Sequence, residues 1–346
     1  MKNLPLLLFL FSFPTWVHSQ MLCGDVLNEE MPSRSAINPL LKANNIANDE
    51  IILIPVVVHV LYHKDWPEHN VSDARICEQI KILNENFSRK NADKIYAPTY
   101  FKNRGVNAKI QFYLASYDAN GNPTSGIVRK APFDFTDPEP CTIEEIISGT
   151  CVKEEEPKGF KYKSERNKIK NLSAPWDKNK YLNLWSVYLE RETGDTGDIL
   201  GYGADPDGIF VTPNHVGKKT STGSYGKIAV HEMGHWLGLN HTWGPTNNYS
   251  CSEDDGIRDT PKQYKEKKVL FEEATNYHFD TCSPSGKGVM FCNYMNYADQ
   301  RVLNMFTANQ VDVMRTSLNS GDRSSRDFAR GCSIISSPHP NAGSNK

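Results

Sequence analysis

The stretch HEMGHWLGLNH, residues 231–241, constrains the fold of this chain more than any other feature. On an α-helix, His231 and His235 are one turn apart, about 5–6 Å between their Cβ atoms, so both imidazoles project from the same face. Gly238 lets the chain leave the helix in a turn that most side chains resist, which brings His241 back to the same point. We therefore expect a helix followed by a glycine turn, with three histidine nitrogens that converge on one zinc ion.

Glu232 lies beside these histidines without being needed as a ligand. Three protein ligands leave one position of a tetrahedral zinc site open for water, as catalytic zinc sites do. Zinc lowers the pKa of a bound water from 15.7 toward about 7, and Glu232 is placed to take the proton of that water and pass it to a leaving amine. The motif therefore predicts metal-assisted hydrolysis of amide bonds, with Glu232 as the general base and a further donor helping zinc to hold the oxyanion.

Chance and a purely structural zinc site each account for less of the motif. Ordinary histidines on a helix produce a bare H-E-x-x-H by chance, but they do not explain Gly238 and His241 at the fixed spacing. A structural zinc site usually recruits a fourth protein ligand and has no use for Glu232.

The extended motif H-E-x-x-H-x-x-G-x-x-H resembles the metzincin clan of zinc metalloproteases, and Thr242-Trp243 resembles the pappalysin (cytophagalysin) family within it. A second stretch, CNYMNYADQRVLNMFTANQ at 292–310, resembles the Met-turn of that family. By this resemblance, Met295 forms an apolar floor beneath the zinc ligands and Tyr297 supplies a hydroxyl that helps to hold the oxyanion. Without the zinc motif upstream, both would be interpreted as core residues.

The resemblance covers most of residues 51–320 and implies an α+β fold. Such a catalytic domain has a twisted, mostly parallel sheet with an antiparallel edge strand, an active-site helix and the Met-turn. Apolar patterning predicts strands at 51–63, 108–118, 181–190 and 207–213. It predicts helices at 72–90, at about 225–239 and at 307–318.

Two helix caps and one edge strand are expected among these elements. Ser72 is expected to cap the first helix, and Thr307 with Gln310 to form a capping box on the last. The strand at 207–213 is expected to lie at an edge of the sheet, where an extended peptide would bind through backbone hydrogen bonds.

The acidic loop CSEDDGIRDTP, residues 251–261, follows the third histidine. Carboxylate oxygens suit calcium, and the resemblance implies calcium in this region. Asp254, Asp259 and Thr260 are the expected ligands. A solvated acidic loop without an ion is the alternative.

The segment after Tyr297 bears on substrate preference. In the family this segment shapes the pocket for the residue after the scissile bond, and an acidic side chain there favours Lys or Arg. This chain has both Asp299 and Arg301, so that preference does not simply carry over. It also has Val302 where family members often have a cysteine, and Cys292 before the Met-turn methionine, which leaves a second disulfide open.

The first residues, MKNLPLLLFLFSFPTWVHSQ, predict a signal peptide over 1–19, because a basic residue precedes an apolar run that ends in Val17-His18-Ser19. The run is too short for a membrane anchor, so a secreted protein is expected, extracellular or periplasmic in transit. Residues 20–50 are expected to be a pro-segment, 51–335 the metzincin catalytic domain and 336–346 a disordered tail.

Cys23 stands alone within the expected pro-segment. Cys23-Gly24 resembles the cysteine-switch segment of some metzincin precursors, and a thiolate is a strong zinc ligand. Cys23 is therefore predicted to fill the fourth zinc position, so that the pro-segment inhibits its own enzyme. A disulfide to a remaining thiol such as Cys77 is the alternative.

Charge and cysteine content add two further expectations. Lys and Arg number 39 against 41 Asp and Glu, a net charge of -2, which gives no reason to expect nucleic acid as a partner. Eight cysteines in an exported chain favour disulfides. Cys141 with Cys151 and Cys251 with Cys282 are expected bridges, and the partners of Cys77, Cys292 and Cys332 stay open.

The leading hypothesis is a secreted zinc endopeptidase that acts on proteins or peptides and is made as a latent precursor. A zinc-bearing adhesion or binding protein with a vestigial site is the first alternative, against which the intact Glu232, Tyr297 and zinc-site histidines argue. A zinc hydrolase of small amides or esters is the second.

Overall fold

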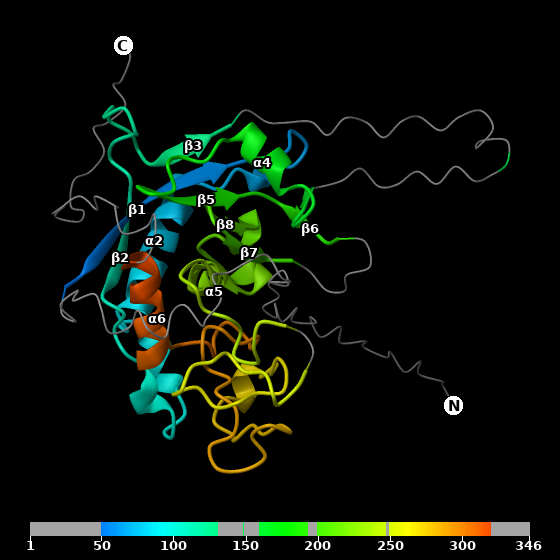
Figure 1. Cartoon of the computed structure of the whole chain (residues 1–346). Helices are drawn as coiled ribbons and strands as arrows, with labels where there is room; N and C mark the ends of the chain where they lie inside the picture. Colours follow the sequence, from blue (N-terminus) through cyan, green and yellow to red (C-terminus); the bar gives the residue numbers. More distant parts are fainter. Residues whose placement is uncertain (1–49, 131–147, 149–158, 193–198, 247–248, 320–346) are drawn as a thin grey trace, which may run out of the picture.

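A mixed β-sheet forms the upper part of the molecule in Figure 1. The computed structural model of the protein describes residues 50–130, 148, 159–192, 199–246 and 249–319. Neighbouring strands follow the order β2-β1-β5-β8-β7, and β3 pairs with β1 beyond the end of β2. The strands of this sheet are β1 Ile52–Val60, β2 Ile110–Leu114, β3 Ile127–Arg129, β5 Leu182–Ser186, β7 Gly201–Asp205 and β8 Gly208–Val211.

Strand β1 is the centre of the parallel part of the sheet. It pairs in parallel with β2, β3 and β5, and β5 pairs in parallel with β8. Strand β7 runs antiparallel to β8 and ends the order of the described strands. The expected α+β fold, with a mostly parallel sheet and an antiparallel edge strand, is therefore confirmed.

Helices and short strands surround this sheet. The α-helices are α2 Asp73–Phe87, α4 Arg166–Leu172, α5 Lys227–Trp236 and α6 Ala308–Asn319. The small two-stranded pairs are β4 Phe160–Lys161 with β6 Leu189–Glu190, and β9 Lys218–Lys219 with β10 Ser224–Tyr225. The 3-10 helices are η2 Pro67–His69, η3 Ala92–Tyr96, η4 Lys102–Arg104, η5 Pro213–His215, η6 Thr220–Thr222 and η7 Phe271–Glu273.

The two faces of the sheet bury different cores, because successive strand residues point to opposite sides. Leu184 and Val211 belong to the larger core with α2 and α5, whereas Trp185 and Phe210 belong to a smaller core on the other face. The larger core continues through α5 into the loops below, where Tyr294 and others join it. Helix α5 thus lies between the sheet and the lower loops (Figure 1).

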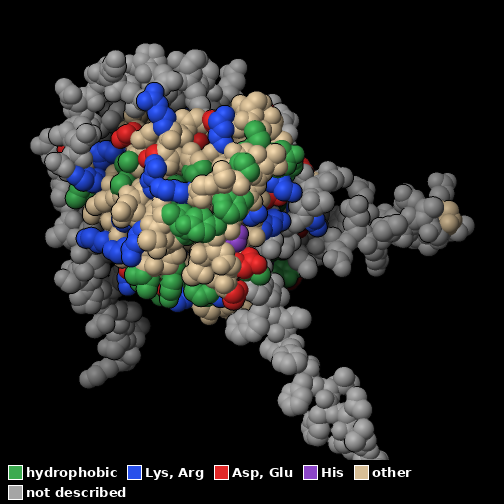
Figure 2. All heavy atoms as spheres, turned by 90° about the horizontal axis from the view of Figure 1, so that it is seen from below, with side chains coloured by type: hydrophobic (Ala, Val, Ile, Leu, Met, Phe, Trp, Pro, Cys, Tyr) green, Lys and Arg blue, Asp and Glu red, His purple; other side chains and the backbone are tan. Residues whose placement is uncertain are grey.

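The lower half of the molecule, residues 237–307, consists mostly of loops (Figure 1). Cys251 and Cys282 form a disulfide with a Cα–Cα distance of 5.3 Å, which confirms that expected bridge. Cys77 and Cys292 are free thiols, the first exposed and the second buried. Figure 2 shows hydrophobic side chains interspersed with Lys and Arg on the face seen from below.

Several local predictions agree with the structure. Ser72 accepts a hydrogen bond from the amide of Arg75 (3.4 Å) and caps α2. Thr307 and Gln310 exchange the two bonds of a capping box before α6, 2.9 Å and 3.3 Å long. The expected strand at 181–190 is divided, however, because β6 leaves the main sheet and pairs with β4.

The prediction that 207–213 forms an edge strand is wrong. Strand β8 lies inside the sheet, between β5 and β7, and all four of its residues are buried. The edge belongs to β7, a glycine-rich segment whose low strand propensity hid it in the sequence. The expected site for an extended peptide therefore moves from 207–213 to Gly201–Asp205.

Some predictions concern residues outside the described ranges. These are the signal peptide, the pro-segment with Cys23 up to residue 49, the bridge between Cys141 and Cys151, Cys332 and the tail. Within the described residues, none of the helices has both the length and the apolar character needed to cross a bilayer.

Candidate active site

Helix α5 carries the first part of the zinc motif and is buried along its whole length. It is shorter than the expected 225–239, because Gly226, at φ +70°, starts it and Leu237 ends it. The side chain of Gln300 accepts hydrogen bonds from the amides of Tyr225 (3.0 Å) and Lys227 (3.1 Å), which satisfies donors at the helix start. Gly238 follows at φ +95°, so the chain turns there as the motif predicted.

The three histidines of the motif converge after this turn. The Nε2 atom of His235 lies 3.0 Å from that of His231 and 3.1 Å from that of His241. Among the described residues, these three are the group of His, Cys, Asp or Glu side chains that could hold a metal ion.

Hydrogen bonds orient two of these imidazoles. The Nδ1 atom of His231 donates to the carbonyl of Tyr294 (2.6 Å), and that of His235 donates to the carbonyl of Leu239 (2.8 Å). With Nδ1 protonated, each neutral ring has its lone pair on Nε2, directed at the common point. Three lone pairs this close repel one another unless a cation lies between them, so the donor set fits a metal ion such as zinc.

Burial keeps these rings in the neutral, metal-binding form. It lowers the pKa of His235 to about 4. The pKa values of His231 and His241 fall well below 6.5 for the same reason, with a further contribution from the neighbouring histidines.

Glu232 is fully buried next to the ligands, and strand β7 passes directly over it. A Cβ added at Gly201 would lie 2.7 Å from the Cγ and Oε1 atoms of Glu232, and one at Gly203 would lie 2.2 Å from its carbonyl oxygen. Only glycine permits this approach at both positions. The Gly-x-Gly pattern at 201–203 is the sequence signal for this contact, and it was not among the predicted site features.

Met295 and Tyr297 lie against the histidines, as the resemblance implied. A Cβ added at Gly234 would lie 2.3 Å from the sulfur of Met295, so this methionine packs directly against α5 between the two helical ligands. The ring of Tyr297 is 5.0 Å from that of His241 and 5.7 Å from that of His231, centroid to centroid. Both side chains are therefore in position for the roles that the resemblance implied.

Two residues that the sequence did not single out as site residues support the third histidine. Trp243 stacks on His241, with 4.3 Å between ring centroids and 9° between ring planes. Gln263 accepts a hydrogen bond from Thr242 (2.9 Å) and donates one to Asn296 (3.2 Å), which joins the loop after His241 to the turn before Tyr297. No local pattern marks a loop glutamine for such a role.

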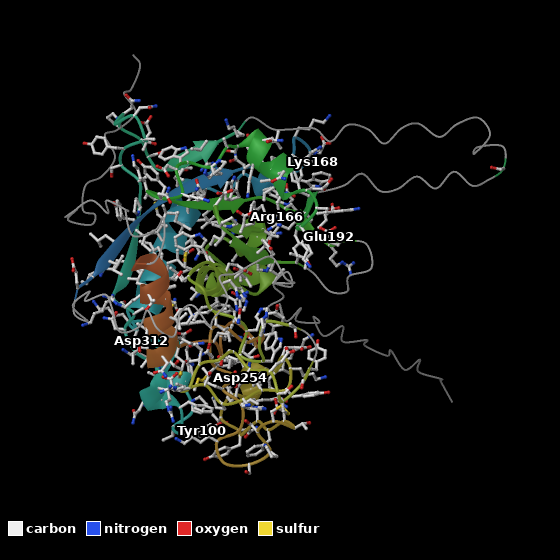
Figure 3. All side chains as sticks on the ribbon, in the orientation of Figure 1. Tyr100, Arg166, Lys168, Glu192, Asp254 and Asp312 are labelled. Atoms are coloured by element: carbon white, nitrogen blue, oxygen red, sulfur yellow. A yellow bond between two sulfur atoms is a disulfide. The ribbon has the colours of Figure 1, made fainter. Side chains whose placement is uncertain are left out.

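The acidic loop uses its expected calcium ligands for other bonds. Asp259 accepts hydrogen bonds from Thr307 (2.6 Å) and from the amide of Asn309 (3.1 Å) at the start of α6. Thr260 donates to the carboxylate of Asp255 (2.8 and 2.9 Å). Asp254 lies in the lower half (Figure 3) and accepts from the amide of Gly256 (2.7 Å). Calcium in this loop stays a prediction.

Asp299 and Arg301 bind each other. The Nε atom of Arg301 is 3.0 Å and 3.1 Å from the two carboxylate oxygens of Asp299, and the guanidinium lies over the ring of Phe271 at 4.8 Å. The bonds to Asp299 raise the pKa of Arg301. The acidic side chain in this segment is therefore already paired with a cation of its own chain.

The fold and this arrangement of ligands define a metzincin-type zinc metalloprotease. The sequence model of peptidase family M43, described as pregnancy-associated plasma protein-A, matches residues 165–319. A promirolysin mutant from Tannerella forsythia is 33% identical, with a TM-score of 0.67 over 84% of this chain and 88% of that one. Mature mirolysin from the same organism, in complex with a cleaved peptide, is 35% identical, with a TM-score of 0.64 over 80% and 95%. The chain belongs to this family, the pappalysins.

Fungal extracellular metalloproteases are related over a shorter stretch. The protein from Arthroderma benhamiae is 36% identical over 107 residues, which is 31% of this chain and 36% of that protein. The protein from Aspergillus oryzae is 35% identical over 91 residues, 26% of this chain and 27% of that protein. The matched region thus spans about a third of the length of these relatives.

Proposed function

We propose that this protein is a secreted zinc endopeptidase in which Glu232 is the general base and Tyr297 stabilises the oxyanion. The observation that carries the proposal is the convergence of three buried Nε2 atoms, 3.0 and 3.1 Å apart, next to the buried carboxylate of Glu232. Zinc bound by these nitrogens would activate a water as nucleophile and polarise the scissile carbonyl.

The side chains around that position supply proton transfer and charge stabilisation. Glu232 takes the proton of the attacking water and delivers it to the leaving amine, a contribution of about 10²–10⁴ in rate for a positioned general base. The phenol of Tyr297, whose ring lies against His231 and His241, donates to the oxygen that becomes negative.

Strand β7 is the proposed platform for the substrate. It ends the order of the described strands and packs on Glu232 through its glycines, so a peptide paired with its outer edge would pass close to the general base. The related mirolysin is described with a cleaved peptide, which supports peptides as the substrate class.

We further propose that the protein is exported as a latent precursor. A pro-form of the related mirolysin exists, which supports a pro-segment at 20–50. In this proposal Cys23 occupies the fourth ligand position until the pro-segment is cut. Calcium in the acidic loop would order a segment that the disulfide already closes.

The mechanism is tested by Glu232→Ala. The variant should keep one zinc per chain, measured by atomic absorption, and lose casein hydrolysis by about 100-fold or more. Glu68→Ala, a change at an exposed carboxylate, is the matched control and should cleave casein like the parent. Full activity of Glu232→Ala would refute the assigned base, and an inactive parent that binds zinc would favour the vestigial binding protein.

Latency is tested separately by Cys23→Ala. That precursor should digest itself or a fluorogenic peptide without an activating protease, and Cys77→Ala, at an exposed thiol, should stay latent. A Cys23→Ala precursor as silent as the parent would exclude the switch.

A further inference from the structure

Lys227, the first residue of α5, is a buried cation that the proposed mechanism does not use. Its side chain is 5% exposed, and its Nζ atom lies 2.6 Å from Oδ2 of Asp93 and 2.5 Å from Oδ1 of Asn86. Burial lowers the pKa of Lys227, and Asp93 opposes that shift.

Helix stability does not account for this lysine. A positive charge at a helix N-terminus is disfavoured by the helix dipole, and a buried ion costs several kcal/mol before its partners repay it. Lys227 is placed one helical turn before His231, on the same side of α5. Its role therefore lies in what it contacts there.

Tyr294 connects Lys227 to the metal centre. The ammonium lies 5.3 Å from the centroid of the Tyr294 ring, and the Tyr294 hydroxyl donates to the same oxygen of Asn86 that accepts from Lys227. The carbonyl of Tyr294 accepts the Nδ1 proton of His231 at 2.6 Å. The ammonium therefore holds both the ring and the hydroxyl partner of the residue whose carbonyl orients a metal ligand.

We propose that Lys227 is a positioning residue for the metal ligand His231. Together with Asp93 and Asn86, it fixes Tyr294 so that the Tyr294 carbonyl holds the His231 ring with Nε2 toward the metal. Charge-assisted hydrogen bonds and a cation–π contact make this support stiffer than neutral contacts would. The inference rests on the proposed zinc function, and it assigns a metal-affinity role to a residue remote from the substrate.

The test measures zinc affinity in a Glu232→Ala background, which prevents self-digestion. Loss of a partner that orients a metal-bound histidine typically weakens metal binding about 10–100-fold. Lys227→Met should therefore raise the zinc Kd, measured by competition with a chromophoric chelator, about tenfold or more. Tyr294→Phe, which removes only the hydroxyl, should raise it about threefold, and Lys227→Arg should recover part of the lost affinity.

Arg315→Met is the matched control. Arg315 is also a buried cation, but it donates to the carbonyls of Ala108, Lys109 and Glu50, which lie at the start of the sheet. This variant should lower the Tm while leaving the zinc Kd within about twofold of the parent. Cobalt in place of zinc gives a second readout, since its visible spectrum should change in Lys227→Met and not in Arg315→Met.

The outcomes separate the two proposals. A parent that binds no zinc overturns the proposed function, and this inference with it. A parent that binds zinc, with a folded Lys227→Met of unchanged Kd and cobalt spectrum, overturns the positioning role alone. If Lys227→Met does not fold, Tyr294→Phe decides: an unchanged Kd there refutes the inference.

Discussion

Gly203 faces the carbonyl of Glu232 so closely that a Cβ on it would lie 2.2 Å from that oxygen. Strand β7, the proposed substrate platform, and helix α5, which carries the proposed base, are therefore in direct backbone contact. The position of one determines the position of the other, because close-packed interiors transmit small displacements.

Gly203→Ala should therefore damage both stability and turnover. We expect the free energy of unfolding to fall by about 1–3 kcal/mol, as for other overpacked sites, and kcat/KM to fall because β7 and Glu232 must separate. Urea unfolding and peptide hydrolysis measure the two effects. Gly159→Ala is the control, since its Cβ would lie 2.2 Å from the carbonyl of Tyr188, on the opposite side of the sheet from α5. An equal loss of kcat/KM in both variants would contradict the prediction.

Removal of the Cys251–Cys282 disulfide should destabilise the lower half. The bond closes a loop with a sequence separation of 31, for which the chain-entropy relation gives about 3–4 kcal/mol. The double variant Cys251→Ser and Cys282→Ser should show this loss in urea unfolding, and added reductant should affect only the parent. The same variant should lose activity, because Gln263 inside the loop supports Thr242 and Asn296. An unchanged unfolding midpoint would show that the loop is held by its other contacts.

Stability should fall in mild acid because of histidines outside the metal site. Burial lowers the pKa of His59 and of His215 to about 4. Between pH 4 and the unfolded value near 6.5, the unfolded chain binds more protons than the folded one, so stability is fully present above pH 6.5 and decreases as the pH falls. Each histidine contributes up to about 3 kcal/mol over this interval.

The experiment compares the parent with His59→Gln, both with a chelator present. The His59 ring is bonded to Ser173 (2.8 Å) and Asn183 (3.0 Å), and glutamine can offer both partners an amide that does not titrate. Urea unfolding from pH 7 to pH 4 should show a shallower decline for the variant. Parallel curves would mean that His59 is not protonated on unfolding.

The pair of Asp299 and Arg301 should limit selection of basic residues. If this segment shapes the pocket after the scissile bond, Arg301 neutralises the acid that would attract Lys or Arg. Cleavage profiling on a peptide library should show a weak basic preference at that position for the parent and a stronger one for Arg301→Ala. Asp299→Asn should not gain it, and identical profiles for all three proteins would place the pair outside the pocket.

Local sequence patterns predicted much of the framework. The spacing of His231, His235 and Gly238 is a helical spacing followed by a residue that tolerates positive φ, and the structure has both. The capping box of Thr307 and Gln310 and the β-branched run of β1 are equally local, and both appear where the sequence placed them. Such features are readable because their partners lie within a few residues along the chain.

Only the tertiary structure decided which strand is the edge and what supports the metal ligands. Gly201 and Gly203 lack the side chains that mark a strand, and they lie in one because α5 leaves no space for anything larger. The carbonyl of Tyr294 that orients His231, and the lysine that holds Tyr294, meet across 63 and 67 residues of chain. Sequence alone determined the identity of the ligands, whereas their orientation depends on contacts between distant segments, which no local pattern encodes.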